Sequence, residues 1–107
     1  MVIEANSFWS IDVLHPGNVI GSRLRGEIRK SHGGDVVATF RFDTPIYEET
    51  ADQTRFRVYL RSAETEKIPV PPTGQSWIYD LLMLLPTGDY KRILKGTVFV
   101  DPGVTDV

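Results

Sequence analysis

Apolar and polar residues alternate with a period of two in several segments of this chain. Segment 22–30, "SRLRGEIRK", places Leu24, Gly26 and Ile28 at every second position, with charged residues between them. A strand with one buried face and one solvated face produces this pattern. The same alternation recurs in three further segments: 8–14, 36–42 and 55–61. The chain is therefore expected to fold mainly as β-sheet.

Turn residues indicate how the expected strands connect. Gly33 and Gly34 lie between two alternating segments, and glycine tolerates the positive φ angles of tight turns. Residues 22–43 are therefore predicted to form one antiparallel hairpin. Ser62 is predicted to cap a single helical turn over 63–67, and the prolines of 69–72 then favour an extended crossing.

A second hairpin is expected at 76–100, around a Pro-Thr-Gly-Asp turn. Both faces of its first strand, 77–84, are largely apolar, so this strand is expected to be central or covered on both sides. On the return strand, Leu94, Gly96, Val98 and Val100 are predicted to point one way and Ile93, Lys95, Thr97 and Phe99 the other. Ile93 and Phe99 are candidate interface residues, because this strand is more apolar than free solvation requires.

Six to eight short strands in 107 residues, with turn signals every 8–12 residues, are typical of a small all-β protein. The expected fold is a single antiparallel β-sandwich over 1–107, immunoglobulin-like or jelly-roll-like, with one short helical turn near 63–67.

Composition excludes several classes of protein. The chain has no cysteine, which excludes a disulfide framework and a thiolate zinc site and fits folding in the cytosol. A formal net charge of -2 provides no global attraction to nucleic acid or to an anionic membrane. The longest apolar run, 81–86, is far shorter than the roughly 20 residues of a membrane-spanning helix. The N-terminus shows no pattern of a signal peptide.

No residue pattern indicates catalysis. His15 and His32 both fall in predicted turns, and two separated histidines do not make a metal site. Glu48, Glu49 and Asp52 share one loop, whereas a glycosidase needs two carboxylates held across a cleft. We therefore expect no enzymatic activity, no cofactor and no metal.

Six arginines occupy predicted outer faces: Arg23, Arg25, Arg29, Arg55, Arg57 and Arg61. If segments 22–30 and 55–61 pair, these side chains form one basic stripe. The stripe could bind nucleic-acid phosphates, or dock on an acidic patch of another protein, where arginine is favoured. The third interpretation is an ordinary solvated face balanced by nearby acids.

A sandwich has edge strands, and an edge strand without protection can pair with another chain. Pro45 and the prolines of 69–72 are expected to block one edge, whereas the C-terminal hairpin has no such block. Assembly of several copies is therefore expected.

The order of these features resembles a group of small phage-encoded structural proteins and the N-terminal domains of phage baseplate-upper and fibre-type proteins. The segments that carry the resemblance are "FWSIDV", "PGNVIG", "GEIRK", "HGGDVVATFRF", "RVYL", "ETEKIP" and "WIYDLLMLLPTGDYKRILKGTVFVDPGVTDV". It spans nearly the whole chain and is strongest over 78–100. Residues 44–54 match nothing in the pattern, and "SFWSID" stands where the pattern carries a Gly-Asp pair.

The resemblance implies a non-catalytic β-sandwich that is made in the host bacterial cytoplasm and built into a virion. Its implied partners are other virion proteins and further copies of itself, and its place is the tail, baseplate, fibre adaptor or capsid surface. Two alternatives stay open. One is a carbohydrate-binding module with Trp9, Trp77 or Tyr90 as a sugar platform, although the alternation of Trp77 with Leu81 favours burial. The other is a nucleic-acid-binding barrel that uses the arginines.

Overall fold

The structure, a computed structural model, describes residues 1–102. The last five positions of the closing segment "DPGVTDV" lie outside the described residues. The described part contains nine strands and one helical turn: β1 Val2–Glu4, β2 Trp9–Pro16, β3 Arg23–Arg29, β4 Val36–Thr39, β5 Arg41–Phe42, β6 Ile46–Glu48, β7 Gln53–Leu60, α1 Ser62–Thr65, β8 Trp77–Leu84 and β9 Tyr90–Asp101. The extra strands beyond the expected six to eight are short pieces of two or three residues.

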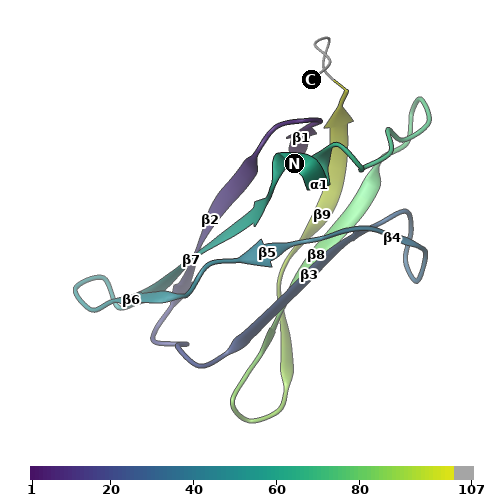
Figure 1. The fold of residues 1–107 in the computed structure, drawn as a ribbon. Coiled ribbons are helices and arrows are strands. Elements are labelled where there is room, and N and C mark those ends of the chain that lie inside the picture. The colour runs from purple at the N-terminus through teal and green to yellow at the C-terminus, as the bar shows by residue number, and fades with distance from the viewer. Residues whose placement is uncertain (103–107) are drawn as a thin grey trace.

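The strands form two sheets that pack face to face (Figure 1). One sheet has five strands in the order β1-β9-β8-β3-β4. The other has β7 at its centre, with β2 on one side and β5 and β6 on the other. Neighbouring strands are antiparallel except β1 and β9, which are parallel. The prediction of a small all-β sandwich is confirmed.

The connectivity is that of an immunoglobulin-like sandwich. β3, β8 and β9 hold the places of strands C, F and G, and β2, β7 and β5 hold those of B, E and D. β1 pairs with β9, the last strand along the chain, instead of lying beside β2. As a result, the side of β2 that faces away from β7 carries no strand in the described chain.

The predicted hairpin over 22–43 is only partly right. β3 and β4 pair as expected, and their register skips Val37. At Phe40 the chain leaves this sheet, so that Arg41 and Phe42 pair with β7 of the opposite sheet. Phe40 is 4% exposed, and its burial between the two sheets explains the crossing.

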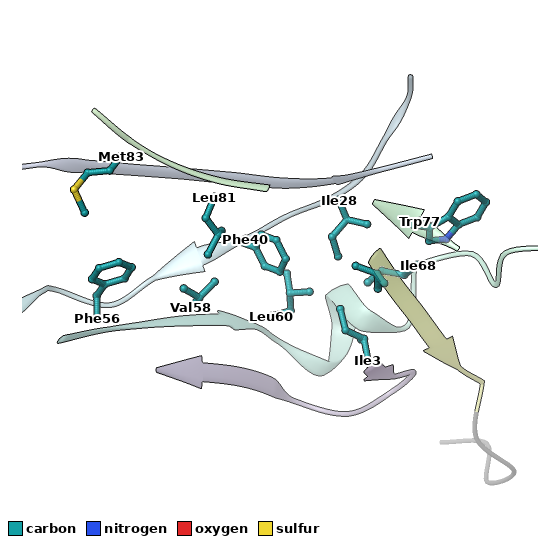
Figure 2. Packing of buried hydrophobic residues seen from close by; sticks show 11 residues of the cluster. Ile3, Ile28, Phe40, Phe56, Val58, Leu60, Ile68, Trp77, Leu81 and Met83 are labelled. Carbon is teal, nitrogen blue, oxygen red and sulfur yellow. The ribbon is translucent and has the colours of Figure 1, made fainter. Parts of the chain in front are cut away.

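The core lies between the sheets (Figure 2). Its buried apolar side chains come from both: Ile3, Ile28, Phe40, Phe56, Val58, Leu60, Ile68, Trp77, Leu81, Met83 and Val98. Phe56, Val58 and Leu60 of β7 point inward, as the alternation over 55–61 predicts, because the strand buries one face. β8 is central, between β9 and β3, also as predicted.

The return strand β9 departs from simple alternation. Leu81 pairs with Leu94 and Leu82 pairs with Arg92, so the register skips Ile93. A bulge of this kind places an extra residue in one strand and turns its side chain away from the expected direction. Ile93 is half-buried and packs against the core, so the prediction that it shares the outer face with Phe99 is wrong.

The helical turn is also displaced from the prediction. It spans Ser62–Thr65, and its N-cap is Arg61 and not Ser62. The Glu64 carboxylate accepts a hydrogen bond from the Arg61 backbone N–H at 3.0 Å and one from Arg41 Nε at 2.8 Å. Partial burial alone would raise the pKa of Glu64, but these hydrogen bonds and the two arginine charges together lower it.

A fully buried hydroxyl ties the β2–β3 connection to β7. Thr54 Oγ1 donates to the Gly17 carbonyl at 2.8 Å and accepts from the Val19 N–H at 3.0 Å. Thr54 is 0% exposed, so no water replaces a lost partner without rearrangement.

Replacing Thr54 by valine keeps the shape of the side chain and removes both hydrogen bonds. The half-buried backbone groups of Gly17 and Val19 then lose these partners, and we expect the free energy of unfolding to fall by about 1–3 kcal/mol. Urea denaturation followed by tryptophan fluorescence measures this. Thr54→Ser, which keeps the hydroxyl, should lose distinctly less, and equal losses for both variants would contradict the assignment.

Candidate functional site

The six candidate arginines do not form one stripe. β3 and β7 belong to different sheets, so Arg23, Arg25 and Arg29 lie on the outer face of the five-stranded sheet. Arg55, Arg57 and Arg61 lie on or beside the outer face of the other sheet. The pairing on which the single basic stripe depended is therefore wrong, because the core separates the two groups.

Most of these arginines have a carboxylate neighbour. Glu27 binds both Arg25, at 3.3 Å, and Arg29, at 3.1 Å. On the opposite face Arg55 binds Glu48 at 2.9 Å, and Arg57 binds Asp12 at 3.4 Å. Exposed ion pairs of this kind contribute little to stability. Within residues 1–102, Arg23 has no carboxylate within ion-pair distance.

The outer face of the five-stranded sheet combines apolar and cationic groups. The outward side chains of β8 include Ile78, Leu82 and Leu84, each half-buried, which we call the apolar strip. Cross-strand neighbours flank each member, as the register shows: Arg29 and Thr97 beside Ile78, Arg25 and Arg92 beside Leu82, Arg23 and Tyr90 beside Leu84. The strip therefore runs between a row of three arginines on β3 and a mixed row on β9 in which Arg92 is the one cation.

A hollow of about 590 Å³ lies on this face. The β3–β4 turn contributes His32 and Gly33 to its wall, and Ile78 contributes apolar surface. Its charged lining consists of Glu27, Arg29, Asp80, Arg92 and Lys95. Asp80 and Arg92 form an ion pair at 3.5 Å. Arg29 and Arg92 are paired with Glu27 and Asp80, so Lys95 is the one lining cation without an ion pair among the described residues.

Phe99 lies near one end of the same face. It is 54% exposed and pairs across the strands with Val2, which is 60% exposed. Both therefore add apolar surface beyond the apolar strip. The outer face thus unites Arg23, Arg25, Arg29 and Phe99, whereas the remaining candidate residues lie elsewhere.

The alternation over 90–100 places Lys95 on the same side as Phe99, but the sequence does not single out Lys95 or Arg92 as a candidate. The register break at Ile93 hides the position of Arg92. Tyr90, which the sequence suggests as a sugar platform, is 60% exposed and lies beside Leu84 on this face.

The proposed sugar platforms differ in their burial. Trp77 is 7% exposed, and its Nε1–H donates to the Pro69 carbonyl at 2.6 Å, so the predicted burial is confirmed. Trp9 is half-buried, with its ring centroid 5.4 Å from that of Phe40. Trp77 is buried and Trp9 is half-buried, which leaves Tyr90 as the most exposed ring of the three.

The remaining titratable candidates have local partners. Tyr47 donates to Asp52 at 2.6 Å, and this hydrogen bond, with partial burial and the Asp52 charge, raises the pKa of Tyr47. Glu48 accepts from Gln53 at 2.8 Å. His15 contacts Lys91 at 3.3 Å, whereas His32 lines the hollow. The described residues contain no cluster of three or more metal-binding side chains, and no helix among them is long and apolar enough to span a membrane.

Comparison with known proteins gives no further guide to the family. No family model matches the chain, and no curated protein matches it significantly.

Proposed function

We propose that the chain is a non-enzymatic structural component of a phage virion that acts through protein–protein assembly, as part of a tail, baseplate or fibre adaptor or as a capsid decoration. Its docking surface is the outer face of the five-stranded sheet. The supporting observation is the apolar strip on β8, flanked by Arg25 and Arg92 across the strands. Interfaces favour this combination of apolar surface with arginine.

The charge of the face indicates the chemistry of its partner. Arg23, Arg25 and Lys95 supply positive charge beside the strip, and only Glu27 and Asp80 oppose them around the hollow. A complementary surface carries carboxylates around an apolar centre, since opposite charges guide association and set the register of docking. The resemblance of the sequence to small phage structural proteins is the support for proposing a virion protein as this partner.

Quantitative mass spectrometry of purified phage particles tests the proposal. The particles are purified from a lysate that contains the chain, so that its amount in particles can be compared with its amount in the lysate. The chain is expected at a fixed copy number relative to the other virion proteins. Its absence from intact particles, while it stays abundant in the lysate, would reject the proposal.

Charge reversal tests the docking face itself. Arg25→Glu and Arg55→Glu are matched, because both residues are exposed at mid-strand and each has a carboxylate partner. Arg25→Glu should lower incorporation into particles by about tenfold or more, since it places like charges at the interface. Arg55→Glu, on the opposite face, should leave incorporation unchanged, and the reverse order would place docking on the other sheet.

A further inference from the structure

Among the open strand edges of the described chain, β2 alone is both long and regular. β1 has three residues, and the register of β4 skips Val37. The β5–β6 side of β7 is interrupted around Pro45. β1 pairs with β9 only over Phe99–Asp101, so the preceding part of β9 is an open edge. That part contains the register break at Ile93 and the cations Lys91, Arg92 and Lys95. Short length, bulges, proline and charge all protect edges from pairing.

β2 has fewer of these protections. Its eight residues pair with β7 without any shift of register, and Pro16 stands only at its end. Its one carboxylate, Asp12, is paired with Arg57 at 3.4 Å. In Figure 1 it lies at the upper left of the sandwich, and β7 is its only strand neighbour among the described residues. This is the edge that an immunoglobulin-like sheet covers with strand A.

The hydrogen-bond pattern identifies the backbone groups that face this edge. Gly17 N–H donates to the Asp52 carbonyl at 2.7 Å, and bonded pairs alternate along an antiparallel ladder. Odd-numbered residues of β2 therefore bond to β7. The backbone groups of Ser10, Asp12 and Leu14 point to the open side. Asp43 N–H donates to the Arg57 carbonyl on the far side of β7, in agreement with this alternation.

Large apolar side chains flank the open groups. Phe8 is 58% exposed and Leu14 is 53% exposed. Trp9, Ile11 and Val13 pack against the core but are only half-buried, and no strand of residues 1–102 lies beyond β2 on this side. A further strand paired with the open edge of β2 would cover both the exposed outer side chains and the half-buried inner ones.

We propose that two copies of the chain pair through β2, antiparallel across a two-fold axis at Ile11. Phe8 of each copy then lies opposite Leu14 of the other, and Ser10 lies opposite Asp12. On the inner face Ile11 meets its equivalent. The two β2 strands join the smaller sheets of both copies into one continuous sheet, an isologous contact that closes on itself.

Other registers are worse for identifiable reasons. Pairing an even-numbered residue with an odd-numbered one fails, because the odd residues already bond to β7. A two-fold axis at Asp12 places two like charges directly opposite each other. An axis at Val13 places Ser10 opposite Pro16, which has no N–H to donate. An axis at Ser10 places Phe8 opposite Asp12 and leaves Leu14 beyond the strand.

This dimer deepens the proposed function by naming one partner, and it rests on that proposal only for its role in assembly. The experiments separate the two. A purified chain that stays monomeric but is found in particles overturns the dimer alone. A dimer that is absent from particles overturns the virion role alone.

The absence of cysteine makes disulfide cross-linking a clean test of the register. Ser10→Cys and Asp12→Cys proteins are oxidised mildly, each alone and as an equal mixture, and analysed by non-reducing electrophoresis. A cross-linked species in the mixture, and little in either single sample, is expected. Cross-linking of Asp12→Cys alone, or of Ser10→Cys alone, would overturn the register.

A matched pair of variants tests the edge in solution. Leu14 and Ile46 are both exposed aliphatic residues opposite Arg55, Leu14 on the open strand and Ile46 on the far side of β7. Analytical ultracentrifugation of the unchanged protein should give twice the chain mass of 12.1 kDa. Leu14→Lys should weaken the dimer by about tenfold or more, since lysine protects an edge, and Ile46→Lys should not. A monomeric unchanged protein, or equal effects of both variants, would overturn the proposal.

Discussion

Replacing Phe40 by alanine is expected to lower the free energy of unfolding by about 3–5 kcal/mol. Phe40 occupies the point where the chain crosses from one sheet to the other, and it is 4% exposed. Its ring lies 5.4 Å from that of Trp9 and 6.2 Å, edge-on, from that of Tyr79. In Figure 2 it stands between Leu81 and Leu60, at the centre of the core. Alanine leaves a cavity that both sheets line.

The expected loss is a large fraction of the roughly 5–15 kcal/mol that stabilises a domain of this size. Urea denaturation measures it, with every variant at the same protein concentration, because the proposed dimer would make the transition concentration-dependent. Phe99→Ala is the control, since Phe99 is 54% exposed and its truncation should change stability by no more than about 0.5 kcal/mol. A loss below about 1 kcal/mol for Phe40→Ala would contradict its central role.

Replacing Gly26 by alanine should destabilise the fold by about 1–3 kcal/mol through overpacking. Gly26 is buried at the middle of β3. A Cβ atom there would overlap the Leu81 side chain and lie 3.0 Å from both the Asp80 carbonyl oxygen and Phe40 Cδ2. The carbonyl belongs to the neighbouring strand, so it moves only if the ladder itself shifts.

Gly96→Ala is the matched comparison for this change. The added Cβ would lie 2.9 Å from Tyr79 Cε1, but Gly96 is exposed and Tyr79 is only half-buried. The ring is free to shift outward, so the loss should stay below about 1 kcal/mol. The same denaturation experiment compares the two variants. Equal losses would show that backbone crowding at Gly26 is not the decisive factor.

The sequence predicts those features of the fold that depend on neighbouring residues, and not those that depend on residues distant in the chain. The inward face of β7 is as expected, because alternation is read from neighbouring residues. Ile93 is different, since the register break that turns it toward the core depends on how β9 fits β8. No pattern in the sequence marks that position.

The same contrast between local and long-range features applies to the candidate interface. The outward direction of Arg25 and Arg57 is read correctly, yet their separation onto opposite faces is not. A strand looks the same in sequence whichever sheet it joins. The crossing at Phe40 takes β5, β6 and β7 into the opposite sheet, and that crossing depends on burial among residues distant in sequence.

The open edge of β2 is the clearest example of what tertiary structure decides. Residues 9–16 form a strand because their apolar and polar positions alternate, and this the sequence determines by itself. Whether that strand has one neighbour or two depends on β1, which pairs with β9 across the molecule. Strand pairing is a competition among distant segments for the same backbone hydrogen bonds, so it is settled by the fold and not by local pattern.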